Sequence, residues 1–142
     1  MNVIKLLSSF LLGSAISLSV GGLLLYAYNQ VPMFLINLTA GAVVVLFILA
    51  YFVSKGKTLA IDVSTVLGVF APILSLSTPA HLAILESFGT SILVSADGLF
   101  QFLGFYAFPL AFVILRIGFR SKITSIKVKP PAGIKTKQTE TN

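Results

Sequence analysis

The chain consists of long apolar runs separated by short polar breaks. Each run has about twenty residues, and a helix of that length crosses a hydrocarbon core of about 30 Å. The strongly polar break at Ser54–Thr58 divides the runs into two helical hairpins. The pattern predicts four transmembrane helices, at about residues 3–28, 32–53, 58–77 and 98–119. Residues 1–120 then form one transmembrane helical domain, followed by a basic tail at residues 121–142.

Residues 80–96, between the third and fourth predicted spans, do not fit the simple pattern. They are mostly apolar but include His81 and Glu86. On a helix, their apolar side chains share one side and most of the serine and threonine side chains lie opposite. This arrangement is typical of a helix in the membrane interface, or of a re-entrant helix that the bundle covers. The alternative is a short fifth span with Glu86 near mid-membrane. The expected fold is therefore an all-α integral membrane protein with four transmembrane helices and an interfacial or re-entrant helix.

Composition supports the membrane class and narrows the chemistry. Of the 142 residues, 56% are hydrophobic and 10% are charged, against about 45–50% and about 25% in a soluble domain. The chain has no cysteine, so disulfides and thiolate metal ligands are excluded. With one histidine and four acidic residues, we expect no metal site and no cofactor.

The basic residues indicate an orientation. They cluster at Lys5, at Lys55 and Lys57, and from Arg116 onward. With four spans all these clusters lie on one side, which the positive-inside rule identifies as cytoplasmic. A fifth span would place the basic tail outside. We therefore predict a multi-pass integral membrane protein with both termini in the cytoplasm.

The net charge of +6 points to an anionic partner. Basic residues beside a span attract anionic lipid headgroups by about 1 kcal/mol each. The tail is too poor in aromatic residues for a nucleic-acid module, so no specific nucleic acid is expected. The residues predicted to contact anionic lipid are Arg116, Arg120, Lys122, Lys127 and Lys129.

Small residues recur at helical spacing in two of the predicted spans. Such rows let helix backbones approach closely in lipid, where the hydrophobic effect does not drive association. The rows are either contacts within this chain's own bundle, which is the commoner case, or a dimerisation face. The predicted packing residues are Ser9, Gly13, Ser17 and Gly21 in the first span, and Ser64 and Gly68 in the third.

Four ionisable side chains are candidates for ion or proton handling, because such groups inside a membrane often mark a pathway. Asp62 lies near the start of the third span, where a structural role at the helix N-terminus is the commoner explanation. His81, Glu86 and Asp97 can form a proton relay or a weak cation site on the outer face. The commoner explanation is a solvated loop and interface helix, with Asp97 capping the fourth span.

The fourth predicted span is rich in phenylalanine, and Pro109 predicts a kink near its middle. The phenylalanine side chains can face lipid, or fill a gap against a partner subunit or a quinone-like tail. Contact with lipid or with the protein core is the commoner role.

These observations favour a non-enzymatic structural or accessory subunit of a larger membrane assembly, either a respiratory or transport complex or a coat-like polymer. Its expected partners are lipids, other membrane subunits and copies of itself. The alternative is a small oligomeric ion channel or ion-coupled transporter that uses Asp62 and Glu86. A membrane enzyme is the least favoured class, since it needs convergent polar groups in a cleft and the sequence offers only His81, Glu86 and Asp97. No residue is identified as catalytic.

Overall fold

The computed structural model describes residues 2–27 and 32–120, and this part of the chain is helical without strands. Four helices in it are long and apolar enough to cross a membrane, consistent with an integral membrane protein. The first three are α1 (Val3–Ala27), α2 (Met33–Ser54) and α3 (Thr58–Leu76). The fourth, Ile92–Gly118, is continuous but has three parts. These are α5 (Ile92–Phe102), the π-helical turn η1 (Leu103–Ala107) and α6 (Phe108–Gly118).

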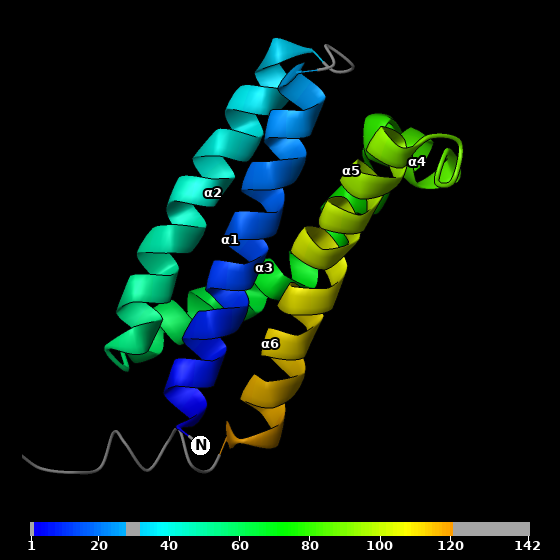
Figure 1. Cartoon of the computed structure of the whole chain (residues 1–142). Coiled ribbons are helices and arrows are strands. Elements are labelled where there is room, and N and C mark those ends of the chain that lie inside the picture. Colours follow the sequence, from blue (N-terminus) through cyan, green and yellow to red (C-terminus); the bar gives the residue numbers. More distant parts are fainter. Residues whose placement is uncertain (1, 28–31, 121–142) are drawn as a thin grey trace, which may run out of the picture.

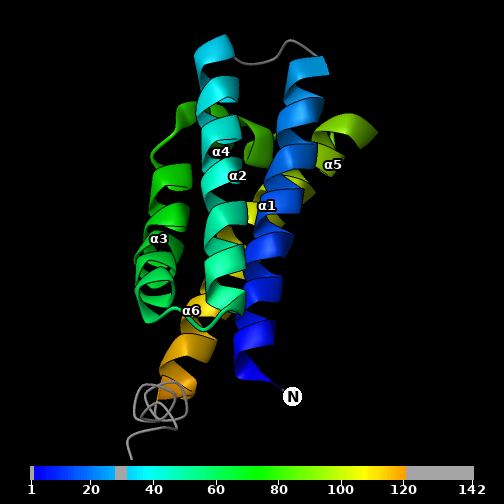
Figure 2. The same ribbon diagram turned by 90° about the vertical axis from the view of Figure 1, so that its left-hand side faces the viewer.

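The helices form a bundle in which α1 is central (Figure 1). It lies antiparallel beside α2 along its whole length and also contacts α5, η1 and α6. Figure 2 shows α3 on the other side of α2, with the fourth span crossing behind. The start of α1, the turn between α2 and α3 and the end of α6 lie at one end of the bundle (Figure 1). We call this the basic end, because Lys5, Lys55, Lys57 and Arg116 belong to these segments.

A short helix, α4 (Pro79–Glu86), lies at the opposite end, beside the start of α5 (Figure 1). The continuous helix expected at residues 80–96 is therefore wrong, since two separate helices share that range. Gly89 interrupts the chain with φ 91°, in the left-handed region that favours glycine. Ser91 then caps α5, because its side-chain oxygen accepts a hydrogen bond from the Val94 N–H at 3.2 Å.

The fourth span consequently begins at Ile92 and not near residue 98. Asp97 lies inside α5, so its expected role as a helix cap is also wrong. The apolar and aromatic residues of α5 continue directly into η1, and Ser91 supplies the cap earlier in the chain. Neither an interfacial nor a re-entrant position of α4 follows from the helix boundaries.

The tightest hydrophobic core lies towards the basic end. Its buried members come from all four long helices: Ile4, Leu7, Leu11, Ala50, Val53, Ala60, Ile61 and Phe112. Along its whole length, α2 has the fewest buried residues of the four long helices, namely Ala50 and Val53. The rest of α2 contacts α1 along one side and leaves its other sides exposed.

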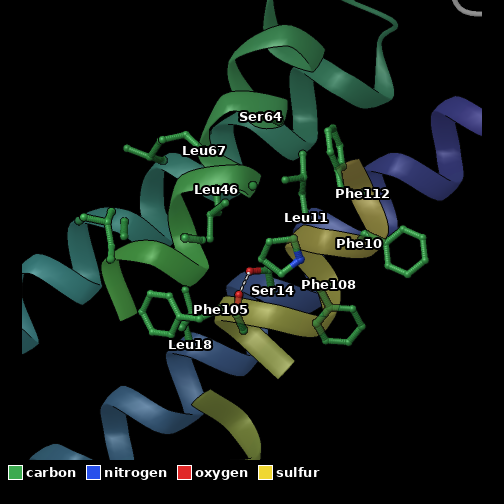
Figure 3. A pocket seen from close by; sticks show the side chains of 18 of the residues that line it. Phe10, Leu11, Ser14, Leu18, Leu46, Ser64, Leu67, Phe105, Phe108 and Phe112 are labelled. Atoms are coloured by element: carbon green, nitrogen blue, oxygen red, sulfur yellow. Dashed lines mark hydrogen bonds between the residues drawn. The ribbon is translucent and has the colours of Figure 1, made fainter. Parts of the chain in front are cut away.

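The π-helical turn in the fourth span has a local cause. The Phe108 N–H donates to the Leu103 carbonyl, five residues back. The next residue is Pro109, which has no N–H to donate. The Gly104 carbonyl therefore has neither an α-helical nor a π-helical backbone donor. The Ser14 hydroxyl of α1 donates to this carbonyl at 2.6 Å instead (Figure 3).

Candidate functional site

A pocket of about 430 Å³, which we call the central pocket, lies inside the bundle. It lies between α1, α2, α3 and the η1–α6 part of the fourth span (Figure 3). Its volume falls in the usual range for small-molecule sites, about 300–1,000 Å³. Its aromatic walls are Phe10, Phe105, Phe108 and Phe112.

The central pocket is elongated along the helix axes. On α1 its lining runs from Phe10 to Leu18, and on α3 from Ser64 to Leu74. At 1.5 Å per residue these stretches span about 12–15 Å. No charged side chain lines this space among the residues that the structure describes. It is therefore suited to an apolar or neutral guest.

Two polar side chains in the wall, Ser64 and Asn37, make no hydrogen bond among the described residues. The Ser64 side chain is 1% exposed, and its hydroxyl makes no hydrogen bond within the described parts of the chain. The Ser14 hydroxyl, also in the wall, is already bonded to Gly104. A buried hydroxyl without a partner costs about 1–3 kcal/mol. The Ser64 hydroxyl oxygen is buried behind the pocket surface, so a guest in the pocket does not touch it.

The small residues predicted for packing mostly lie against the fourth span of the same chain. A Cβ on Gly13 would be 3.0 Å from Phe108 Cζ, and one on Gly21 would be 3.2 Å from Asp97 Oδ1. A Cβ on Gly68 would be 2.9 Å from Val113 Cγ2. Ser17 is buried as well, whereas Ser9 is exposed and donates to the Lys5 carbonyl. The close contacts of these glycines are therefore within the bundle.

Asp62 has a basic partner that the sequence analysis did not identify. Its Oδ1 lies 3.0 Å from the Arg116 guanidinium, so the start of α3 is tied to the end of α6. The two side chains are 55% and 20% exposed, which limits the pair to about 1 kcal/mol or less. Arg116 had been expected only as a lipid anchor. Arg120 ends the described part of the chain, and Lys122, Lys127 and Lys129 lie outside it.

His81, Glu86 and Asp97 are placed at the other end of the bundle, but no hydrogen bond or ion pair between described residues joins them. Glu86 is exposed at the end of α4. Asp97 is 6% exposed and lies beside Gly21. Within residues 2–27 and 32–120, no group of three acidic or histidine side chains could hold a metal ion. The expected relay or cation cluster therefore does not form among these residues.

His81 instead packs against an aromatic ring. Its ring centroid lies 4.9 Å from that of Phe105. Its Nδ1 is buried without a hydrogen-bond partner in the described chain. This burial lowers the pKa of His81 below its ordinary value of 6.5. The imidazole is therefore neutral at pH 7 and joins α4 to the fourth span through apolar contact.

Acidification is expected to destabilise the protein through His81. Below about pH 6.5 an unfolded histidine takes up a proton that the buried His81 resists, because its folded-state pKa is lowered. Stability is therefore complete above pH 6.5 and is lost as the pH falls towards the folded pKa, by at most about 1.4 kcal/mol per pH unit. Unfolding measured from pH 7.5 to 5 should be less pH-dependent in His81→Leu than in wild type. Equal pH dependence in both proteins would contradict this.

A second polar cluster was missed by sequence analysis. The Ser75 hydroxyl accepts hydrogen bonds from Gln101 Nε2 at 3.3 Å and from the Tyr106 hydroxyl at 3.1 Å. Ser75 and Gln101 are both buried, so this cluster joins α3 to the fourth span inside the bundle. Gln101 was the available signal, because an amide in a long apolar run needs a partner in lipid.

Comparison of this chain with models of protein families, with curated proteins and with solved structures finds no match.

Proposed function

We propose that the chain is a non-enzymatic membrane subunit with a structural or accessory role in a larger membrane-embedded assembly. Its partners are other membrane subunits or copies of itself, together with lipids. One observation carries the proposal, namely the exposed pair Asn37 and Gly41 on α2.

These two residues lie one helical turn apart and are both exposed. A Cβ added at Gly41 would meet no atom within 4 Å. The glycines inside the other long helices, such as Gly13 and Gly68, are occupied by contacts within the chain. Asn37 makes no side-chain hydrogen bond that involves only described residues. An amide and a small residue in lipid favour close approach of another helix, which satisfies the amide.

The orientation in this proposal has both termini in the cytoplasm. It rests on the positive-inside rule, because the basic residues of the described chain belong to segments at one end of the bundle. The basic residues that follow α6 add attraction to anionic headgroups. The scattered positions of the ionisable side chains support a non-enzymatic role, since catalysis needs polar groups that converge.

The second function expected from the sequence, an oligomeric ion channel or ion-coupled transporter, receives less support. Asp62 is paired with Arg116 at the basic end. Glu86 ends α4 at the opposite end of the bundle (Figure 1). One pathway through a single chain would have to connect these distant sites. Buried Asp97 is the described acid best placed for such a role.

Larger apolar side chains at Asn37 and Gly41 are expected to weaken association of the chain with its partners. The native mass of the full chain, extracted in mild detergent, should exceed that of one chain. Gly41→Leu or Asn37→Leu should weaken association by about tenfold, since interhelical polar contacts in membranes contribute about 1–2 kcal/mol. Ala42→Leu is the matched control, because Ala42 is also exposed on α2 and lines the central pocket with the pair, but lies about 100° around the helix from Gly41. A lone chain in wild type, or equal effects of all variants, would overturn the proposal.

A further inference from the structure

We propose that a second pocket, beside Asp97, binds a primary ammonium group on a stem of one or two carbons, with the Asp97 carboxylate as its counter-ion. This space, which we call the outer pocket, lies between α1, α4 and α5, at the end of the bundle opposite the basic end (Figure 1). It shares no lining residue with the central pocket, and neither Asn37 nor Gly41 belongs to its wall. This binding function therefore goes beyond the assembly role proposed above.

Asp97 is a buried acid without a counter-ion in the described chain. Its side chain makes no hydrogen bond and no ion pair with residues 2–27 or 32–120. The lysine and arginine residues of these ranges belong to the basic end, and His81 is neutral. A carboxylate removed from water without an opposite charge is costly, so acids inside a membrane pair with a cation or mark a binding site.

The Asp97 carboxylate can be reached from the outer pocket. Asp97 lines this pocket, and its oxygens are not among the fully enclosed polar atoms that lack a partner in the described chain. Ser91 and Leu93 line the same pocket and are exposed at the start of α5, so the pocket opens at this end of the bundle. Asp97 is about 7.5 Å along the helix from Ile92, the first residue of α5. A small solute therefore reaches the carboxylate without crossing the bundle.

The size and the wall of the outer pocket fit a short alkylammonium ion. Its volume is about 80 Å³. A water molecule occupies about 30 Å³ in the liquid, so the pocket has room for about two or three groups of that size. Apart from Ser91 and Asp97, the wall consists of leucine, isoleucine and valine side chains. The alkyl stem then lies against hydrocarbon, while the ammonium group donates to the carboxylate and, at the mouth, to water.

The wall also selects an ammonium ion over a metal ion. A hard cation such as Ca²⁺ is bound by about six to eight oxygen ligands. The Asp97 carboxylate is the anionic group of the wall, and the Ser91 side-chain oxygen already accepts the Val94 N–H at 3.2 Å. Ser91 precedes Asp97 by six residues, about 9 Å along the helix, which separates the two polar groups within the pocket. A single carboxylate is sufficient for an ammonium group but not for such a metal ion.

Equilibrium dialysis of radiolabelled ethylammonium tests the proposal on the purified full chain in phosphatidylcholine nanodiscs. Wild type should bind the ion saturably, with one site per chain. Asp97→Asn keeps the shape of the side chain and removes its charge, so it should weaken binding at least tenfold, the factor that a hydrogen bond between charged groups supplies. Glu86→Gln is the matched control, because Glu86 is an exposed acid at the same end of the bundle, and it should leave binding unchanged. Methylammonium should compete at least tenfold better than Na⁺ or tetramethylammonium, which has no N–H.

Two variants of α1 provide the spatial control. Leu24 lines the outer pocket, whereas its neighbour Leu23 is exposed and does not. Leu24→Trp should reduce ethylammonium binding at least tenfold by filling the space, and Leu23→Trp should leave it unchanged. Circular dichroism checks that each variant is folded.

Nanodiscs that contain phosphatidylethanolamine identify the source of the ammonium group. Competition between this lipid and ethylammonium would mean that a lipid headgroup supplies the group. Binding of ethylammonium that the lipid does not reduce would mean that the ligand is a free amine from water. Both results support the outer pocket as an ammonium site.

Three results would overturn the proposal: undiminished binding in Asp97→Asn, equal competition by Na⁺ and methylammonium, or equal binding by the two tryptophan variants. The outer pocket is separate from Asn37 and Gly41, so Asp97→Asn should not alter the native mass. A wild-type chain that associates but binds no ethylammonium would reject this inference alone. A lone wild-type chain that binds ethylammonium would reject the assembly role alone.

Discussion

Replacement of Gly104 by valine is expected to lower the free energy of unfolding by about 3 kcal/mol, at the upper end for an overpacked core position. Gly104 is buried in η1, directly against α1. A Cβ there would lie 2.6 Å from Leu18 Cδ2 and 2.8 Å from Leu18 Cγ. These distances are far below ordinary contact, so the Leu18 side chain must leave its position or α1 and the fourth span must separate. Unfolding of the full chain in mixed micelles measures the loss.

A double-mutant cycle identifies Leu18 as the cause. Leu18→Ala removes the atoms nearest to the added Cβ, so Gly104→Val should cost at least 1 kcal/mol less in that background. Gly118→Ala is the matched control, since Gly118 also lies in the fourth span but a Cβ there meets nothing within 4 Å. It should stabilise the helix by about 0.5–1 kcal/mol. Equal losses at Gly104 in both backgrounds would contradict the steric explanation.

The sequence predicted the first three long helices closely. Their boundaries differ from α1, α2 and α3 by about one residue, because each ends at a polar or proline-containing break that the apolar pattern makes visible. The fourth span was placed too late. Its start depends on the Gly89 backbone and the Ser91 cap, whereas Asp97–Gly98 was the more obvious turn signal.

The site was less accessible to sequence reasoning, because it depends on which helices meet. The row of small residues identified Gly13 and Gly21, but not their neighbours in the fourth span. Asp62 and Arg116 are 54 residues apart, so their pairing has no local signal. For the phenylalanine residues of the fourth span, contact with lipid or with the protein core was the favoured role. Phe105, Phe108 and Phe112 line the central pocket between helices of the chain, which the sequence pattern did not predict.

Pro109 joins these observations in one local arrangement. It leaves the Gly104 carbonyl without a backbone donor, and that carbonyl accepts the Ser14 hydroxyl. The same turn carries Phe105 and leads into Phe108, which form part of the pocket wall. The irregular helix therefore both attaches to α1 and shapes the space beside it. A regular α-helix here would turn the residues beyond Ala107 to a different angle around the axis.

Replacement of Ser14 by alanine is accordingly expected to cost about 2 kcal/mol of unfolding free energy. The change leaves the buried Gly104 carbonyl without its hydrogen-bond donor, in the range expected for an unsatisfied buried group. Ser19→Ala is the control, because the Ser19 hydroxyl donates to Ala15 within α1. The Ala15 carbonyl belongs to the regular helix, so loss of the Ser19 hydroxyl should cost less than about 0.5 kcal/mol of unfolding free energy. Both are measured in the same mixed micelles.

Restoring a backbone N–H at residue 109 should reduce the unfolding free energy that the Ser14 hydroxyl contributes. In Pro109→Ala, residue 109 can donate to a carbonyl of the preceding turn, so Gly104 no longer depends on α1 alone. Ser14→Ala should then cost at least 1 kcal/mol less than it does in the presence of Pro109. An undiminished cost would mean that Ser14 stabilises the bundle through its packing and not through the donor that Pro109 lacks. The cycle thereby separates the hydrogen bond from the close contact between α1 and η1.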